Sequence, residues 1–121
     1  MKGVYAVFLY LEESKSIEIG AKGEIDFKAG VYVYIGSAMN GVENRLKRHY
    51  SSEKNNYWHI DYFTDEASPF YWLAFPLSSR YECVLAEACE DEGVEIEGFG
   101  ASDCDCSAHL FYLPSACKQV I

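Results

Sequence analysis

The chain has 121 residues and a formal net charge of −9, and half of its residues are hydrophobic. This apolar content excludes a disordered chain, and the length predicts one folded domain over residues 1–121. The charge argues against a strongly basic nucleic-acid-binding protein. No apolar run approaches the roughly 20 residues that span a bilayer, and the amino terminus is apolar too briefly for a signal peptide. We therefore expect a cytoplasmic protein without a membrane partner.

The order of apolar runs and turn residues predicts a mixed α+β fold in which strands form hairpins. The run 70–76 is expected to be a short buried strand, after a break at Ser68-Pro69, and 57–63 a short helix or turn. Gly36-Ser37-Ala38 is expected to be a turn that brings the backbone close to another group. The expected strands are 3–11, 16–19, 24–27, 31–35, 70–76, 94–99 and 109–113, and the expected helices are 42–49 and 80–92.

The stretch 30–50 joins a tyrosine-bearing strand, a glycine turn and a basic helix. Residues three and four apart share a helical face, so Arg45, Arg48 and His49 are expected to lie together. Arginine binds phosphate, and tyrosine or histidine can transfer a proton, so this set suits a phosphodiester. Arg48 is interpreted as an ordinary surface residue or as a second phosphate contact.

Charge is distributed unevenly along the chain. Residues 41–54 carry four basic and two acidic side chains, whereas 82–105 carries nine acids and no Lys or Arg. A small basic face on an acidic body can meet a phosphate locally, but it gives little long-range attraction.

A cysteine and histidine cluster, Cys104-x-Cys106-x-x-His109, could hold Zn²⁺. The usual spacing of two residues between cysteines is missing, and a fourth ligand would have to come from a distant residue. The alternative is a tight turn whose cysteines pack as small apolar groups. The candidate fourth ligands are Cys83, Cys89 and His59.

The aromatic segment 57–63 contains His59 and Asp61, two residues apart. We interpret them as a structural hydrogen bond between an imidazole and a carboxylate. The alternative is a supporting role beside a site, or nucleic-acid stacking by Tyr57 and Trp58.

Several motifs in order resemble the GIY-YIG nuclease superfamily. Gly3-Val4-Tyr5 and Tyr34-Ile35-Gly36 look like its paired signature, and Arg45 with His49 looks like its helical Arg and His. Further pieces resemble a narrower, mainly archaeal branch (domain of unknown function 123), which in some organisms is fused to a DNA-repair glycosylase. These pieces are YIGSA, RLKRH, WHIDY, EC and FGASDCDCSAHLF.

The resemblance implies a small central antiparallel sheet flanked by helices and a nuclease site that uses Mg²⁺ or Mn²⁺. Tyr5 and Tyr34 would be the signature tyrosines, one of which orients or activates a water. Arg45 would hold the scissile phosphate and His49 would assist proton transfer. Glu82 would bind the metal, with Glu87 as second choice.

The implied function is a metal-dependent endonuclease acting on nucleic acid, DNA rather than RNA, in DNA repair and with a repair protein as possible partner. The loop before Arg45 is about one residue longer than in the commonest members, and the superfamily's late Asn has no obvious counterpart. Together with the acidic charge, these departures motivate an alternative, a non-catalytic adaptor for nucleic acid or protein. A small zinc protein built on Cys104, Cys106 and His109 is the third hypothesis.

Overall fold

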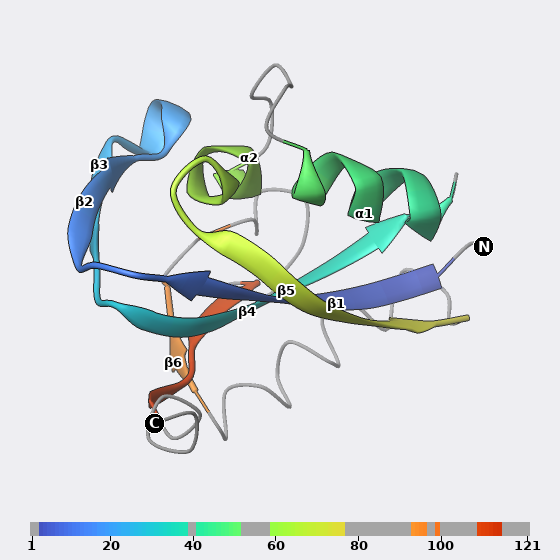
Figure 1. Ribbon diagram of the computed structural model, residues 1–121. Helices are drawn as coiled ribbons and strands as arrows, with labels where there is room; N and C mark the ends of the chain where they lie inside the picture. Colours follow the sequence, from blue (N-terminus) through green and yellow to red (C-terminus); the bar gives the residue numbers. More distant parts are fainter. Residues whose placement is uncertain are drawn as a thin grey trace.

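A five-stranded antiparallel sheet forms the centre of the molecule in the computed structural model (Figure 1). The structure describes residues 3–38, 41–51, 59–76, 93–96, 99 and 109–114. From one edge to the other, the sheet consists of β5 (Ser68–Phe75), β1 (Gly3–Leu11), β4 (Gly30–Ala38), β7 (Leu110–Tyr112) and β6 (Val94–Glu95). The part of the chain that the structure describes also contains the α-helices α1 (Val42–Tyr50) and α2 (His59–Thr64). The predicted mixed α+β class is therefore confirmed.

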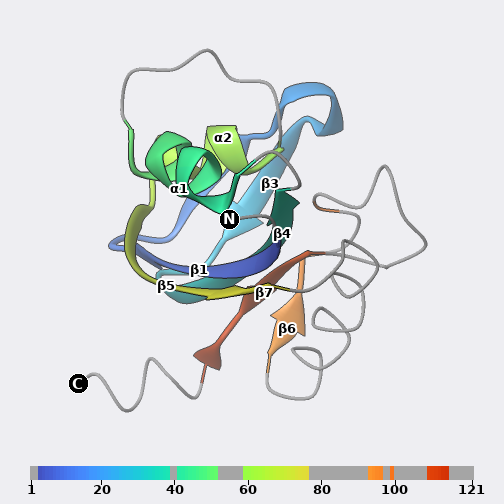
Figure 2. The same cartoon turned by 90° about the vertical axis from the view of Figure 1, so that its right-hand side faces the viewer.

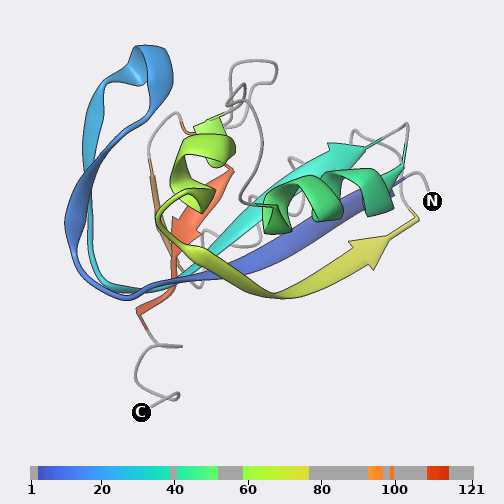
Figure 3. The ribbon, with the colours of Figure 1, turned by 45° about the horizontal axis from the view of Figure 1, so that its top comes forward.

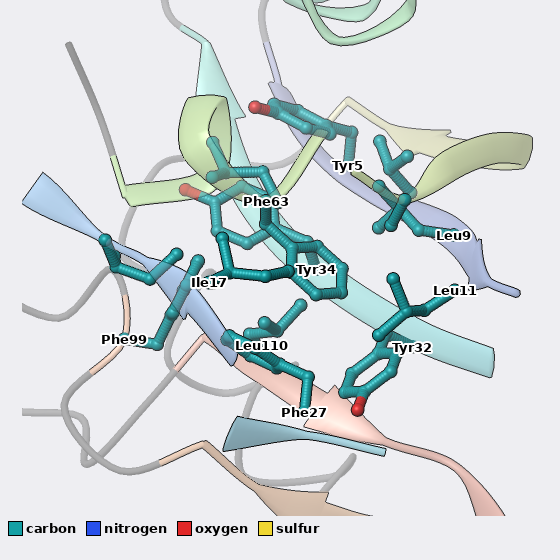
Figure 4. Close-up of a cluster of buried hydrophobic side chains, with 14 of the residues drawn as sticks. Tyr5, Leu9, Leu11, Ile17, Phe27, Tyr32, Tyr34, Phe63, Phe99 and Leu110 are labelled. Atoms are coloured by element: carbon teal, nitrogen blue, oxygen red, sulfur yellow. The ribbon is translucent and has the colours of Figure 1, made fainter. Parts of the chain in front are cut away.

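Both faces of the two central strands are buried, which explains their nearly continuous apolar sequences. Successive side chains of a strand point to opposite faces. Tyr5, Val7 and Leu9 of β1 therefore join the larger core cluster, on the face that α1 and α2 cover (Figure 2). Val4 and Ala6 join a second, smaller cluster. Figure 4 shows the aromatic part of the larger cluster.

A hairpin extends the core at one end of the sheet (Figure 3). It pairs β2 (Lys15–Glu18) with β3 (Glu24–Phe27), and the 3-10 helix η1 (Gly20–Lys22) lies between the two strands. Phe27 of the hairpin packs on Phe63 of α2, with ring centroids 4.9 Å apart. The hairpin is thus held by burial against α2 as well as by its own hydrogen bonds.

The turn predicted at Gly36-Ser37-Ala38 is wrong, because β4 continues through these residues to Ala38. They pair with the beginning of β1, in the register Gly3↔Ala38 and Tyr5↔Gly36. A backbone that finds partners in a neighbouring strand has no reason to turn, and that pairing cannot be read from the local sequence. Met39 and Asn40, which follow Ala38 in the sequence, lie outside the described residues.

Residues 70–75 do form a strand, as predicted, but the strand begins at Ser68, ends at Phe75 and is not buried. β5 is an edge strand, and Phe70, Tyr71 and Trp72 are each about half exposed. The break expected at Ser68-Pro69 is also absent, since both residues belong to β5. An edge strand tolerates proline because one side of its backbone faces no partner strand.

The strand expected over 94–99 is shorter, since β6 contains only Val94–Glu95. The chain then turns so that the Phe99 N–H donates to the Ile96 carbonyl, and Phe99 is fully buried. β7 falls within the predicted 109–113. The predicted helix 80–92 lies outside the described residues. Within the part of the chain that is described, no helix is long and apolar enough to cross a membrane.

Candidate functional site

Two tyrosines of the predicted site lie on adjacent strands and on the same face of the sheet. Tyr5 of β1 is paired with Gly36 of β4, and Tyr34 of β4 is paired with Val7 of β1. Both belong to the larger core cluster, where Figure 4 shows them together. Because the register is antiparallel, two residues far apart in sequence come to lie diagonally across one strand pair.

The pairing of Tyr5 with Gly36 requires glycine. A Cβ atom added at Gly36 would lie 2.6 Å from both Cζ and the hydroxyl oxygen of Tyr5, closer than real side chains approach. The expectation that Gly36 lets the backbone come close to another group is therefore confirmed, although the group is a tyrosine ring and the position is in a strand. The absence of a side chain at Gly36 leaves the space that the Tyr5 phenol occupies.

His49 reaches both tyrosines from α1. Val42, Leu46 and His49 are the buried residues of this helix, at a spacing that places them on one face, turned to the sheet. The His49 Nε2 atom is 2.7 Å from the Tyr5 hydroxyl, within a buried hydrogen bond. Its ring centroid lies 5.5 Å from that of Tyr5 and 5.8 Å from that of Tyr34. Three of the five predicted site residues thus form one cluster, here called the Tyr–His–Tyr cluster.

The Tyr–His–Tyr cluster is nearly closed to solvent. Tyr5 is 1% exposed, His49 2% and Tyr34 8%. A phenol and an imidazole joined by a hydrogen bond can pass a proton between them, and the low dielectric of a buried site strengthens that bond. The arrangement can therefore transfer protons within the protein, with Tyr34 as its most exposed member.

Arg45 lies one helical turn before His49 on α1 and is half-buried. Residues four apart are neighbours on a helix surface, so Arg45 borders the face that carries His49. Arg45, Arg48 and His49 lie three and four residues apart on α1, as predicted, but their surroundings differ. His49 is buried, and Arg48 extends toward Asp61 of α2.

Arg48 binds Asp61 of α2 through two nitrogen atoms. Its Nη2 donates to Oδ2 at 2.8 Å and its Nε donates to Oδ1 at 3.3 Å. Arg48 is therefore more than an ordinary surface residue, and its alternative interpretation as a second phosphate contact stays a prediction. Arg48 is thus a partner of the Asp61 carboxylate. His59 and Asp61 both lie in the helix 59–64, where residues two apart do not face each other, so this geometry does not favour the hydrogen bond predicted between them.

His59 lies at the beginning of α2 and packs edge-on against Phe99, with ring centroids 5.5 Å apart. Partial burial, and secondarily the positive charge of Lys22, lower the pKa of His59 below its ordinary value. Phe99 also contacts the rings of Tyr34 and Phe63. Phe99 was expected in a strand and opens the motif FGASDCDCSAHLF, but neither observation predicted that its ring would contact Tyr34, His59 and Phe63.

The remaining predicted residues lie mostly outside the described part of the chain. These are Glu82, Glu87, Tyr57, Trp58, Cys83, Cys89, Cys104 and Cys106. Among the described residues, no group of three or more His, Cys, Asp or Glu side chains is arranged to hold a metal ion. His109 is buried next to β7. The magnesium site and the zinc site both remain predictions, and elemental analysis of purified protein for stoichiometric zinc tests the second.

The fold and the Tyr–His–Tyr cluster together define a small α+β domain in which a histidine of a basic helix is buried against a tyrosine of the sheet. Residues 4–121 match the family model described as domain of unknown function DUF123, and the chain belongs to this family. Neither the comparison with curated proteins nor the comparison with solved structures produced a match.

Proposed function

We propose that the protein is a metal-dependent endonuclease of GIY-YIG type that hydrolyses phosphodiester bonds in nucleic acid. The observation that carries the proposal is the 2.7 Å hydrogen bond between Tyr5 and His49, with Tyr34 beside it. Those three residues come from β1, α1 and β4, and the resemblance in sequence had named all three. Substrate DNA rather than RNA, a role in DNA repair with a repair-protein partner, and a cytoplasmic location are parts of the same proposal.

The proposed division of roles follows from side-chain chemistry. Arg45, half-buried beside His49, would hold the scissile phosphate, because a guanidinium donates two parallel hydrogen bonds to phosphate oxygens. His49 would accept or return a proton, with Tyr5 fixing its ring through the hydrogen bond. A Mg²⁺ or Mn²⁺ ion, with Glu82 as expected ligand, would supply charge stabilisation when bound.

A nuclease assay with Mg²⁺ or Mn²⁺ tests the proposal on branched, flapped and single-stranded DNA and on RNA. We expect Arg45→Ala, His49→Gln and Glu82→Ala each to lower the cleavage rate by at least about 100-fold, as loss of a catalytic group does. Tyr5→Phe removes only the hydroxyl that contacts His49. Its matched control is Tyr10→Phe, on the same strand but half exposed and outside both core clusters. Cleavage that survives Arg45→Ala and Glu82→Ala unchanged would reject the assignment.

A second candidate is a nucleic-acid-binding protein without cleavage. It is favoured by the burial of Tyr5 and His49, since hydrolysis needs a water molecule at the reacting groups. The exposed aromatic side chains of β5 also favour it, because bases stack on such side chains. Salt-dependent binding of oligonucleotides, with no cleavage in any divalent metal, would support this candidate over the nuclease.

A further inference from the structure

The ion pair between Arg48 and Asp61 connects the last turn of α1 to the first turn of α2. The Asp61 side chain is completely buried, whereas 28% of the Arg48 side chain is exposed. Two nitrogen atoms of one guanidinium contact two oxygen atoms of one carboxylate. Such a forked contact restricts orientation as well as distance, which a single contact from a lysine ammonium would not do.

Helix α2 is itself held firmly, because Ile60 and Phe63 on either side of Asp61 are buried in the larger core cluster. Asp61 therefore offers Arg48 a fixed point. Arg48 is adjacent to His49 along α1, so holding the guanidinium limits how far this helix can rotate about its axis. That rotation decides whether His49 Nε2 lies within hydrogen-bond distance of the Tyr5 hydroxyl, as it does at 2.7 Å.

We propose that Arg48 and Asp61 are positioning residues that hold His49 against Tyr5, and that Arg45 rather than Arg48 meets the phosphate of the substrate. The first half stands on the geometry of α1, α2 and β1 alone. The second half rests on the proposed function. The guanidinium of Arg48 is already engaged in two contacts to a buried carboxylate, and leaving them would expose that carboxylate's charge to a site that cannot solvate it.

Nitrogen NMR of the histidine rings tests the first half, because the chain contains only three histidines. The informative variant is the double substitution Arg48→Met with Asp61→Leu. Replacing both members of a buried ion pair by apolar residues usually preserves folding, whereas removing one leaves an uncompensated charge. We expect this variant to stay folded while the Nε2 resonance of His49 shifts or broadens.

A matched control is the exposed ion pair between Lys15 and Glu66, whose side chains are 38% and 45% exposed. The double substitution Lys15→Met with Glu66→Leu should leave the His49 resonance unchanged. Arg48→Lys is a second variant, which keeps the charge but loses the fork, and we expect an intermediate displacement. An unchanged His49 resonance in a folded Arg48→Met/Asp61→Leu protein, or in Arg48→Lys if the double variant does not fold, would overturn the positioning role.

Fluorescence anisotropy with a single-stranded DNA oligonucleotide at several salt concentrations tests the second half. Each lost phosphate contact should reduce the slope of log affinity against log salt by about 0.7. We expect that reduction for Arg45→Gln and none for Arg48→Met/Asp61→Leu. An equal reduction in the double variant would overturn the assignment of the phosphate to Arg45. Absence of binding by the unsubstituted protein would reject the proposed function and this assignment together, while the NMR result would stand.

Discussion

The ring of Tyr5 can lie against Gly36 in the candidate site because glycine has no side chain. The Tyr5 ring lies so close to Gly36 that the Cβ atom of any other residue at position 36 would overlap with it. The φ angle of Gly36 is not positive, so glycine is needed at this position for space and not for its backbone conformation. A substitution at this position therefore tests packing alone.

We expect Gly36→Ala to lower the free energy of unfolding by about 1–3 kcal/mol, the usual cost of forcing an extra methyl group into a packed core. Chemical denaturation measures this loss. Tyr5→Leu should relieve the clash, so that Gly36→Ala costs less in that background than in the natural protein. Equal costs in the two backgrounds would show that the Tyr5 ring is not what excludes the methyl group.

His59 should make stability depend on pH. Its pKa is lowered in the folded protein by partial burial and by Lys22, so the unfolded chain binds the proton more readily. The stability that follows from this difference is fully present above the pKa of the unfolded state, about 6.5, and is lost as the pH falls through the lower folded value. We expect the stability advantage of the natural protein over His59→Gln to shrink between pH 7.5 and 5. An advantage that grows on acidification would contradict the sign of the shift.

At the scale of elements, the position of a strand in the sheet decides its burial more than its composition does. The segments 4–11 and 70–75 are similarly rich in apolar and aromatic residues. β1 lies between two partner strands and is almost entirely buried, whereas β5 has one partner strand among the described residues and is largely exposed. Phe70 lies where the β1–β5 register shifts, and 54% of its surface is exposed.

Substitutions on the two strands should therefore differ in cost. We expect Phe70→Thr on β5 to change the free energy of unfolding by no more than about 1 kcal/mol, in the range of surface substitutions. Leu9→Ala on β1 removes a fully buried side chain and should cost about 2–5 kcal/mol. Urea denaturation of both variants compares them directly. A loss above 3 kcal/mol for Phe70→Thr would mean that β5 is covered in solution.

For the whole molecule, the net charge of −9 limits how strongly any nucleic acid can be bound. Residues 41–54 contain four basic side chains, of which Arg48 is engaged by Asp61, so we expect at most three phosphate contacts from this stretch. At about 0.7 per contact to a single strand, we expect log affinity to fall with log salt with a slope near −2. Anisotropy titrations measure it. A slope steeper than −4 would require a basic surface that the composition does not offer near α1.

The sequence alone determined much of the local structure and three members of the candidate cluster. Strands 3–11 and 24–27 match their predicted bounds, and the helix predicted from residue 42 begins there, because alternation, turn glycines and helical spacing act within a few residues. Tyr5, Tyr34 and His49 could be named because they resemble an ordered motif.

Only the tertiary structure decided which of these residues contact one another and which are engaged by other partners, as Arg48 is by Asp61. Four features depend on contacts between residues distant in sequence. They are the pairing that extends β4 through Gly36, the edge position of β5, the ring contacts of Phe99 and the ion pair between Arg48 and Asp61. Each depends on which surfaces are buried against each other when the chain closes on itself. That choice is made by the packing of the whole molecule, so no stretch of sequence carries it.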